Sequence, residues 1–127
     1  MDFDIENTIV HELVFWGNSR EELQSFPDGP RREAGYQLHK VQVGEQPADF
    51  KPMTIVGLGV EELRVRDASG AYRVFYIARF DQTVYVLHAF EKKTQKTAPQ
   101  DIKTGQERYR SLMKWRSKNA GASDGAF

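Results

Sequence analysis

The chain has 127 residues, of which 39% are hydrophobic and 12% aromatic, so it can bury the core of one domain and is too apolar for general disorder. Its 18 basic residues balance 18 acidic ones, and this zero net charge argues against a role that depends on overall positive charge. The absence of cysteine excludes disulfides, thiolate metal sites and cysteine nucleophiles.

The charges are unevenly distributed along the chain. Up to position 28, Arg20 is the only lysine or arginine. The acidic residues in this part of the chain are Asp2, Asp4, Glu6, Glu12, Glu21, Glu22 and Asp28. From position 92 onward, basic residues outnumber acidic ones. The C-terminal part could therefore face a polyanion, although a solvated helix face would have the same composition.

Membrane attachment is not expected. No apolar run approaches the ~20 residues of a membrane-spanning helix. The first residues, MDFDIENTIV, are acidic where a signal peptide would be basic. We expect a soluble, cytoplasmic protein.

The N-terminal part predicts one strand and two helices. Residues 9–17 (IVHELVFWG) are apolar and aromatic and are followed by a turn, which predicts a strand at a sheet edge. Ser19 and Glu22 have the spacing of a capping box, which predicts a short helix to about Ser25. A second helix should run from Asp28 to Val43 and stop at Gly44, with its apolar positions Ala34, Leu38 and Val41 on the face toward the sheet. The connector 44–59, rich in proline and glycine, should be irregular.

The centre of the chain predicts an antiparallel meander. Residues 63–67, 72–80 and 83–90 read as strands, separated by the short turns 67–70 and 80–82. Connections of this length cannot hold a crossover helix, so neighbouring strands must pair antiparallel.

Strand alternation predicts where the basic side chains of this meander lie. Arg64 and Arg66 point away from Leu63 and Val65, and Arg73 and Arg79 share a face with the apolar residues of their own strand. The third strand leaves the sheet through His88, Phe90 and the basic segment 92–96. Guanidinium and ammonium groups both bind phosphate oxygens, so these positions could converge on one anionic ligand. The alternative is a solvent-facing sheet with cross-strand salt bridges to Glu62 or Asp67.

The C-terminal part predicts a third helix. Thr97 to Gln100 again have capping-box spacing with an early proline, and the helix should run to about Arg116, with Ile102, Tyr109, Leu112 and Met113 forming its buried stripe. Residues 1–118 should form a single domain, and residues 119–127 a disordered tail.

Four stretches carry a recognisable pattern: PRREAGYQLHKVQVG (30–44), ELRVRDASGAYRVFYIARF (62–80), VYVLHAFEKKTQKT (84–97) and DIKTGQERYRSL (101–112). Together they resemble the phage-derived Gp49-like toxins, a HigB-type branch of the RelE/ParE toxin superfamily. This resemblance implies an α+β fold: an antiparallel sheet of about four strands, with two N-terminal helices and one C-terminal helix packed on it. It also implies a type II toxin–antitoxin system with a helix–turn–helix antitoxin as partner, and cleavage of mRNA on the ribosome.

The resemblance also suggests site residues. Arg64 or Arg66, Arg73, and Lys92 or Lys93 stand where RelE-type toxins place the basic residues that bind the scissile phosphate. Arg79, Lys96 and Arg108 are further candidates for RNA contact. The chain lacks the tyrosine that RelE has early in its last helix, so the general base is not identified; His88 is a catalytic candidate but could equally be a core residue.

The implied activity is metal-independent endoribonuclease cleavage, in which a ribose 2′-OH attacks the adjacent phosphate. We expect no cofactor and no metal, because three scattered histidines and no carboxylate cluster offer no dedicated site. Two alternatives stay open: a ParE-like toxin that inhibits DNA gyrase by protein–protein contact, and an inactive phage accessory protein that only binds a partner.

Overall fold

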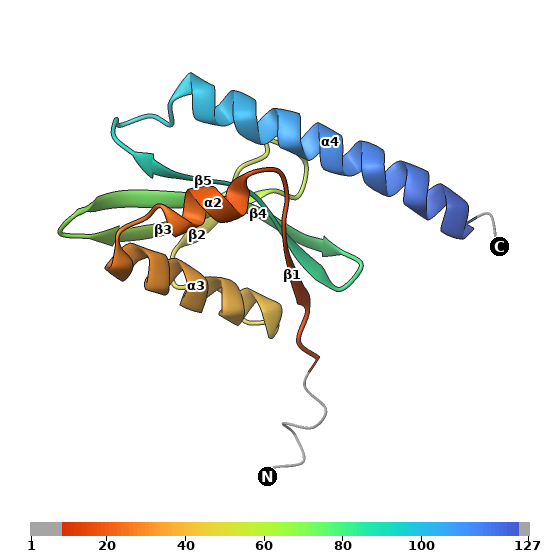
Figure 1. The fold of residues 1–127 in the computed structure, drawn as a ribbon, viewed down its shortest axis with the longest axis horizontal. Helices are drawn as coiled ribbons and strands as arrows, with labels where there is room; N and C mark the ends of the chain where they lie inside the picture. Colours follow the sequence, from red (N-terminus) through yellow and green to blue (C-terminus); the bar gives the residue numbers. More distant parts are fainter. Residues whose placement is uncertain (1–8, 125–127) are drawn as a thin grey trace, which may run out of the picture.

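A computed structural model describes residues 9–124 of the chain. The elements follow in the order β1 (Glu12–Phe15), α2 (Ser19–Gln24), α3 (Asp28–Gln42), β2 (Phe50–Pro52), β3 (Glu61–Asp67), β4 (Gly70–Phe80), β5 (Thr83–Lys92) and α4 (Pro99–Asp124). They build a five-stranded sheet in the order β1-β5-β4-β3-β2. Helix α3 lies on one face of the sheet and α4 on the other, so the molecule has three layers (Figure 1).

The α+β fold class is confirmed, and the sheet differs from the prediction in two respects. The β3–β4–β5 meander is antiparallel as predicted, but β1 pairs with β5 in parallel, so the sheet is mixed. The rest of the sheet lies between β1 and β5 in sequence, so no hairpin turn dictates their relative direction. Residues 50–52, expected to be irregular, pair with β3 as a short edge strand that ends at Pro52, which cannot donate a further ladder hydrogen bond.

Each face of the sheet has its own apolar core. On one face, Ala34, Leu38 and Val41 of α3 pack against Leu63 and other strand residues, as the helix pattern predicted. On the opposite face, the α4 stripe packs against strand residues that include Phe75, Ile77 and Leu87, with Leu112 fully buried. The helix approaches the sheet closely at Gly105, where a Cβ would lie 2.8 Å from Phe75 Cδ2.

The last helix is longer than predicted. It begins at Pro99 as expected but continues past Arg116 to Asp124. The tail predicted at residues 119–127 is therefore helical as far as Asp124, and residues 125–127 lie outside the described part of the chain.

The residues of the first predicted capping box have a different role. No side chain makes a capping hydrogen bond at the N-terminus of helix α2. Ser19 Oγ instead donates to Val86 O at 3.0 Å, and Glu22 accepts from Ala89 N at 3.2 Å. The last residue of β5 that pairs with β1 is Val86. From there on, backbone groups at the edge of β5 form hydrogen bonds with side chains from α2 rather than with another strand. The tertiary contact prevails over the local capping pattern.

Candidate anion-binding site

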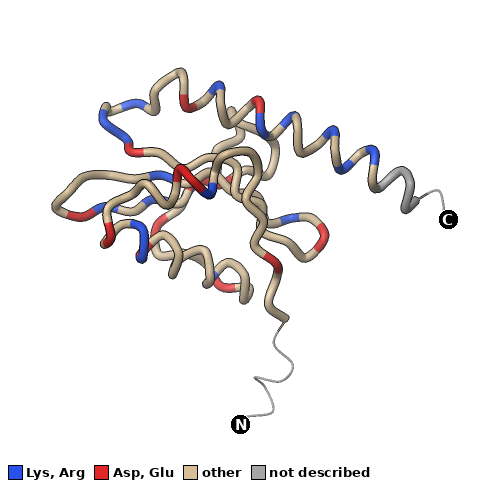
Figure 2. Tube along the Cα trace, in the orientation of Figure 1, with Lys and Arg blue, Asp and Glu red and all other residues tan. Residues whose placement is uncertain are grey.

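Strand register brings the basic residues of the meander together. In the strand register, Arg64 lies opposite Arg73, and Arg73 opposite Phe90. Arg66 lies opposite Ala71, and Ala71 opposite Lys92. The basic side chains therefore share one face of the sheet, the face that α4 covers further along the strands. They line a recess of about 430 Å³, whose lining is completed by Lys93, Thr94 and Gln95 from the loop between β5 and α4. Figure 2 shows basic positions on these strands and on that loop at the same end of the molecule. The predicted convergence of Arg64, Arg66, Arg73, Lys92 and Lys93 is therefore present in the geometry.

Arg73 forms the buried part of this recess. It is only 3% exposed, and its Nη1 donates to Tyr72 O at 3.1 Å. Its Nε lies 3.7 Å from Oε1 of Glu62, which is 1% exposed. Burial lowers the pKa of Arg73 below its usual range, Glu62 opposes this, and the nearby Arg64 and Arg66 add to it. The guanidinium thus has one buried counter-charge among several cations.

The rim of the recess is more accessible. Arg64 is partly exposed, and its Nε lies 3.9 Å from Asp49 Oδ1. Arg66 and Lys93 are exposed, and Lys92 donates to Gln95 O, which shapes the loop. Desolvation and the neighbouring Arg73 lower the pKa of Lys92. A phosphate in the recess would meet charged donors from both the strands and the loop.

His88 lies outside this recess. It is 6% exposed, its ring stacks on Phe90 at 4.9 Å, and both ring nitrogens face carboxylates. Nδ1 lies 2.8 Å from Glu22 Oε1 and Nε2 lies 2.8 Å from Asp101 Oδ1. These contacts join α2, β5 and α4, so the geometry indicates a structural role for a residue that sequence reasoning left as a catalytic candidate.

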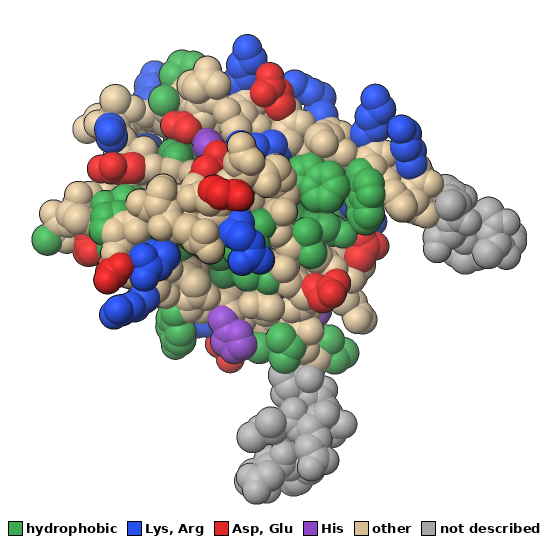
Figure 3. Space-filling view, in the orientation of Figure 1, with side chains coloured by type: hydrophobic (Ala, Val, Ile, Leu, Met, Phe, Trp, Pro, Cys, Tyr) green, Lys and Arg blue, Asp and Glu red, His purple; other side chains and the backbone are tan. Residues whose placement is uncertain are grey.

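The three predicted RNA-contact residues do not line the recess. Arg108 is engaged by Glu22, with Nη–Oε distances of 2.8 and 2.9 Å, and by Leu87 O at 3.0 Å. Lys96 follows the lining residues in the same exposed loop. Other basic residues of α4, including Arg110 and Lys114, are exposed, and Lys and Arg side chains project along this helix in Figure 3.

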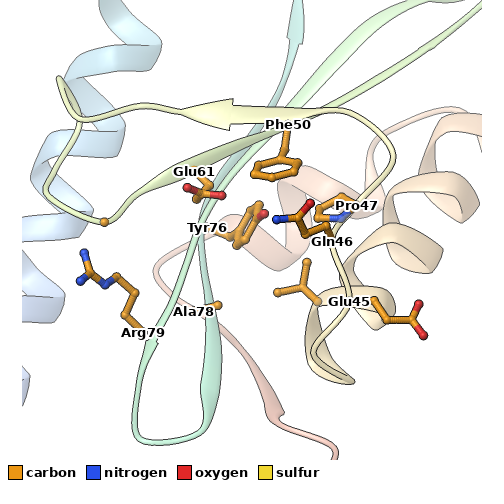
Figure 4. A pocket seen from close by; sticks show the side chains of 10 residues that line it. Glu45, Gln46, Pro47, Phe50, Glu61, Tyr76, Ala78 and Arg79 are labelled. Atoms are coloured by element: carbon orange, nitrogen blue, oxygen red, sulfur yellow. The ribbon is translucent and has the colours of Figure 1, made fainter.

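Arg79 lies at a different place on the sheet. It is six residues beyond Arg73 on β4, roughly 20 Å along the strand. It lines a separate pocket of about 340 Å³ with Glu61, Tyr76 and Phe50 (Figure 4). Burial raises the pKa of Glu61, and the charge of Arg79 opposes that shift. Arg79 is thus a natural control for the residues of the basic recess.

Sequence reasoning treated Glu62 only as a salt-bridge partner and did not identify Lys51. Lys51 Nζ lies 4.0 Å from Glu62 Oε1, beside the Arg73 guanidinium. The signal for Glu62 was available, because it alternates in step with Arg64 and Arg66 and must point to their face. Lys51 carried no such signal, since its strand was taken for an irregular connector.

Within residues 9–124, no group of three or more His, Cys, Asp or Glu side chains is arranged to hold a metal ion. In the same range, no helix combines the length and apolarity needed to span a membrane. The charged side chains that line the recess are cations, and fixed cations can surround an anionic group.

The mixed sheet between helical layers places the protein in a known class of folds. Among solved structures, it is similar to a mutant of the E. coli toxin RelE in the free state, with a TM-score of 0.56 and 15% sequence identity, over 74% of this chain and 96% of that one. This likeness concerns the fold. Residues 21–110 match the family described as "Phage derived protein Gp49-like (DUF891)", and the chain belongs to that family. No curated protein matches the chain.

Proposed function

We propose that this protein is the toxin of a type II toxin–antitoxin system and acts in the cytoplasm as a ribosome-dependent mRNA endoribonuclease that inhibits translation. The family and the RelE-like fold support the toxin class. The observation that carries the nuclease activity is the convergence of Arg64, Arg66, Arg73, Lys92 and Lys93 on one recess.

The recess suits cleavage by an internal nucleophile. The ribose 2′-hydroxyl loses its proton to water as its oxygen attacks the adjacent phosphorus. The bond to the 5′-oxygen breaks and that oxygen takes up a proton, which leaves a 2′,3′-cyclic phosphate and a new 5′-hydroxyl end. Negative charge builds up on the phosphate oxygens in the transition state, and fixed guanidinium and ammonium groups stabilise it without a metal ion. The ribosome and the codon would hold the RNA in the geometry for in-line attack.

The proposed partners are mRNA on the ribosome and a cognate helix–turn–helix antitoxin. Neutralisation by the antitoxin requires that it cover the recess or keep the protein from the ribosome. Co-expression of the cognate antitoxin is expected to restore growth in cells that produce this protein.

A reconstituted translation reaction tests the nuclease activity. Purified protein is added to ribosomes programmed with end-labelled mRNA, and to the same mRNA alone. We expect cleavage within the ribosome-bound codon, with 2′,3′-cyclic phosphate ends, and much less cleavage of free mRNA. Intact mRNA in both reactions would rule out the nuclease.

A further inference from the structure

A carboxylate is buried directly beneath the basic recess. Glu62 lies on β3 between its register partners Lys51 and Phe75, and its side chain is 1% exposed. Its Oε1 lies 3.7 Å from Arg73 Nε and 4.0 Å from Lys51 Nζ, while its Oε2 is buried without a hydrogen-bond partner. Arg73 Nε is likewise buried without one.

Stability alone does not require a carboxylate at this position. For a buried ion pair without close hydrogen bonds the cost of desolvation can exceed the attraction, and a well-packed apolar pair is often as stable or more so. Phe75, the cross-strand neighbour of Glu62, is fully buried in the apolar core beneath α4, so an apolar side chain would suit the surroundings. Stability alone therefore does not account for Glu62.

Two of the three Arg73 guanidinium nitrogens lie against groups of the protein. Nη1 donates to Tyr72 O, and Nε is turned toward Glu62. Of the three guanidinium nitrogens, Nη2 is left for an anion in the recess that Arg73 lines. The charge of Glu62 favours the positively charged guanidinium, which Arg64 and Arg66 repel.

We propose that Glu62 is a positioning residue of the nuclease site: its buried carboxylate holds the Arg73 guanidinium so that Nη2 points at the scissile phosphate. This inference rests on the proposed function for the identity of the phosphate. The orientation of Arg73 itself does not depend on that function. Glu62 does not contact the RNA, so its removal should impair turnover more than binding.

The test compares Glu62→Gln with Glu61→Gln, which removes the adjacent carboxylate from the opposite face of β3. The first measurement is the ¹⁵N spectrum of the Arg73 side chain. In the wild type and in Glu61→Gln, slow rotation of the held guanidinium should give separate Nη signals. In Glu62→Gln these signals should merge, while the circular-dichroism melting curve still shows a folded protein.

The second measurement is single-turnover cleavage of ribosome-bound mRNA, with binding followed on a 2′-deoxy oligonucleotide that cannot be cleaved. Glu62→Gln should cleave roughly tenfold or more slowly, yet bind the oligonucleotide within about twofold of the wild type because the recess cations remain. In an Arg73→Lys background, Glu62→Gln should cause little further loss, since the two residues act as a unit.

The outcomes distinguish the positioning role of Glu62 from the nuclease function of the protein. Separate Nη signals in Glu62→Gln, wild-type cleavage by that variant, or additive losses in the double variant would each overturn the positioning role. A wild-type protein that cleaves no mRNA would overturn the nuclease function instead. The guanidinium spectra would still decide whether Glu62 orients Arg73.

Discussion

Glu22 and His88 are joined by a 2.8 Å contact between Oε1 and Nδ1, and the second ring nitrogen of His88 lies 2.8 Å from Asp101. Each ring nitrogen thus faces one carboxylate, Glu22 on α2 and Asp101 on α4. Glu22 also binds the Arg108 guanidinium. This cluster of Glu22, His88, Asp101 and Arg108 fastens α2 and α4 to β5, and the basic loop lies between its attachment points on β5 and α4.

The first prediction concerns acid stability. Burial alone would raise the pKa of Glu22, but hydrogen bonds from His88 and Arg108 outweigh it and lower the pKa from 4.5 to about 2. Because the folded-state value is the lower one, Glu22 stabilises the fold above about pH 4.5, by roughly 3 kcal/mol, and loses that contribution as the pH falls toward 2. Urea unfolding of Glu22→Gln should show a deficit at pH 7 that shrinks at pH 3. Glu21→Gln, on the exposed side of the same helix, is the control, and a deficit independent of pH would contradict the assignment.

The second prediction concerns His88. Glutamine has a single donor nitrogen where imidazole has a nitrogen facing each carboxylate, so His88→Gln should break one of the two contacts and lose roughly 2–3 kcal/mol of unfolding free energy, a cost limited by the partial exposure of Glu22 and Asp101. Chemical denaturation at pH 7 measures this. His39→Gln, on the exposed side of α3, should cost almost nothing. If His88 were a proton donor or acceptor in catalysis instead, its replacement would abolish cleavage without lowering stability.

The third prediction separates the recess from the rest of the basic surface. Arg64→Ala removes a half-exposed cation from the rim and should slow cleavage by roughly 10²-fold, the usual effect of removing a donor to developing charge. Arg79→Ala removes an equivalent charge from the other end of β4 and should keep nearly full activity. Initial rates of mRNA cleavage on ribosomes provide the comparison. Equal losses in both variants would mean that general charge, not the recess, governs activity.

The fourth prediction uses the lowered pKa of Lys92. Since desolvation and the neighbouring Arg73 make Lys92 lose its proton at a lower pH than an ordinary lysine, anion binding should weaken as the pH rises through this lowered value. Binding of a 2′-deoxy oligonucleotide followed from pH 7 to pH 10 should show the decline. Lys92→Arg should move it to higher pH, because arginine stays charged. An unchanged profile in this variant would assign the decline to another group.

The meander and its basic face were predictable because the turns at 67–70 and 80–82 are too short to permit any other pairing. Once the strands pair locally, alternation alone places Arg64, Arg66 and Arg73 on one face. The same logic predicted that Ala34, Leu38 and Val41 face the sheet, since a helical period repeats over the whole of α3. These features depend on neighbours in sequence.

What escaped prediction depends on contacts between distant residues. β1 pairs with β5, which lies far from it in sequence, so no local turn sets the direction of β1. Ser19 and Glu22 fit a local capping pattern, yet the unpaired edge of β5 and the side chains of His88 and Arg108 offer them stronger partners. Arg108 was expected to contact RNA because of its charge and the family resemblance, and its contacts to Glu22 and Leu87 O explain why it turns inward.

The central claim is that the recess cleaves mRNA, and 5′-end mapping of cellular mRNAs after brief induction without antitoxin tests it most directly. Arg73→Lys is the matched control with strongly reduced activity, because lysine keeps a positive charge near Glu62 but lacks the guanidinium fork. We predict new 5′ ends within translated codons, in a fixed position relative to the reading frame, and far fewer of them in the Arg73→Lys cells. Growth arrest with intact mRNA would contradict the nuclease account and direct the search to a protein target such as DNA gyrase.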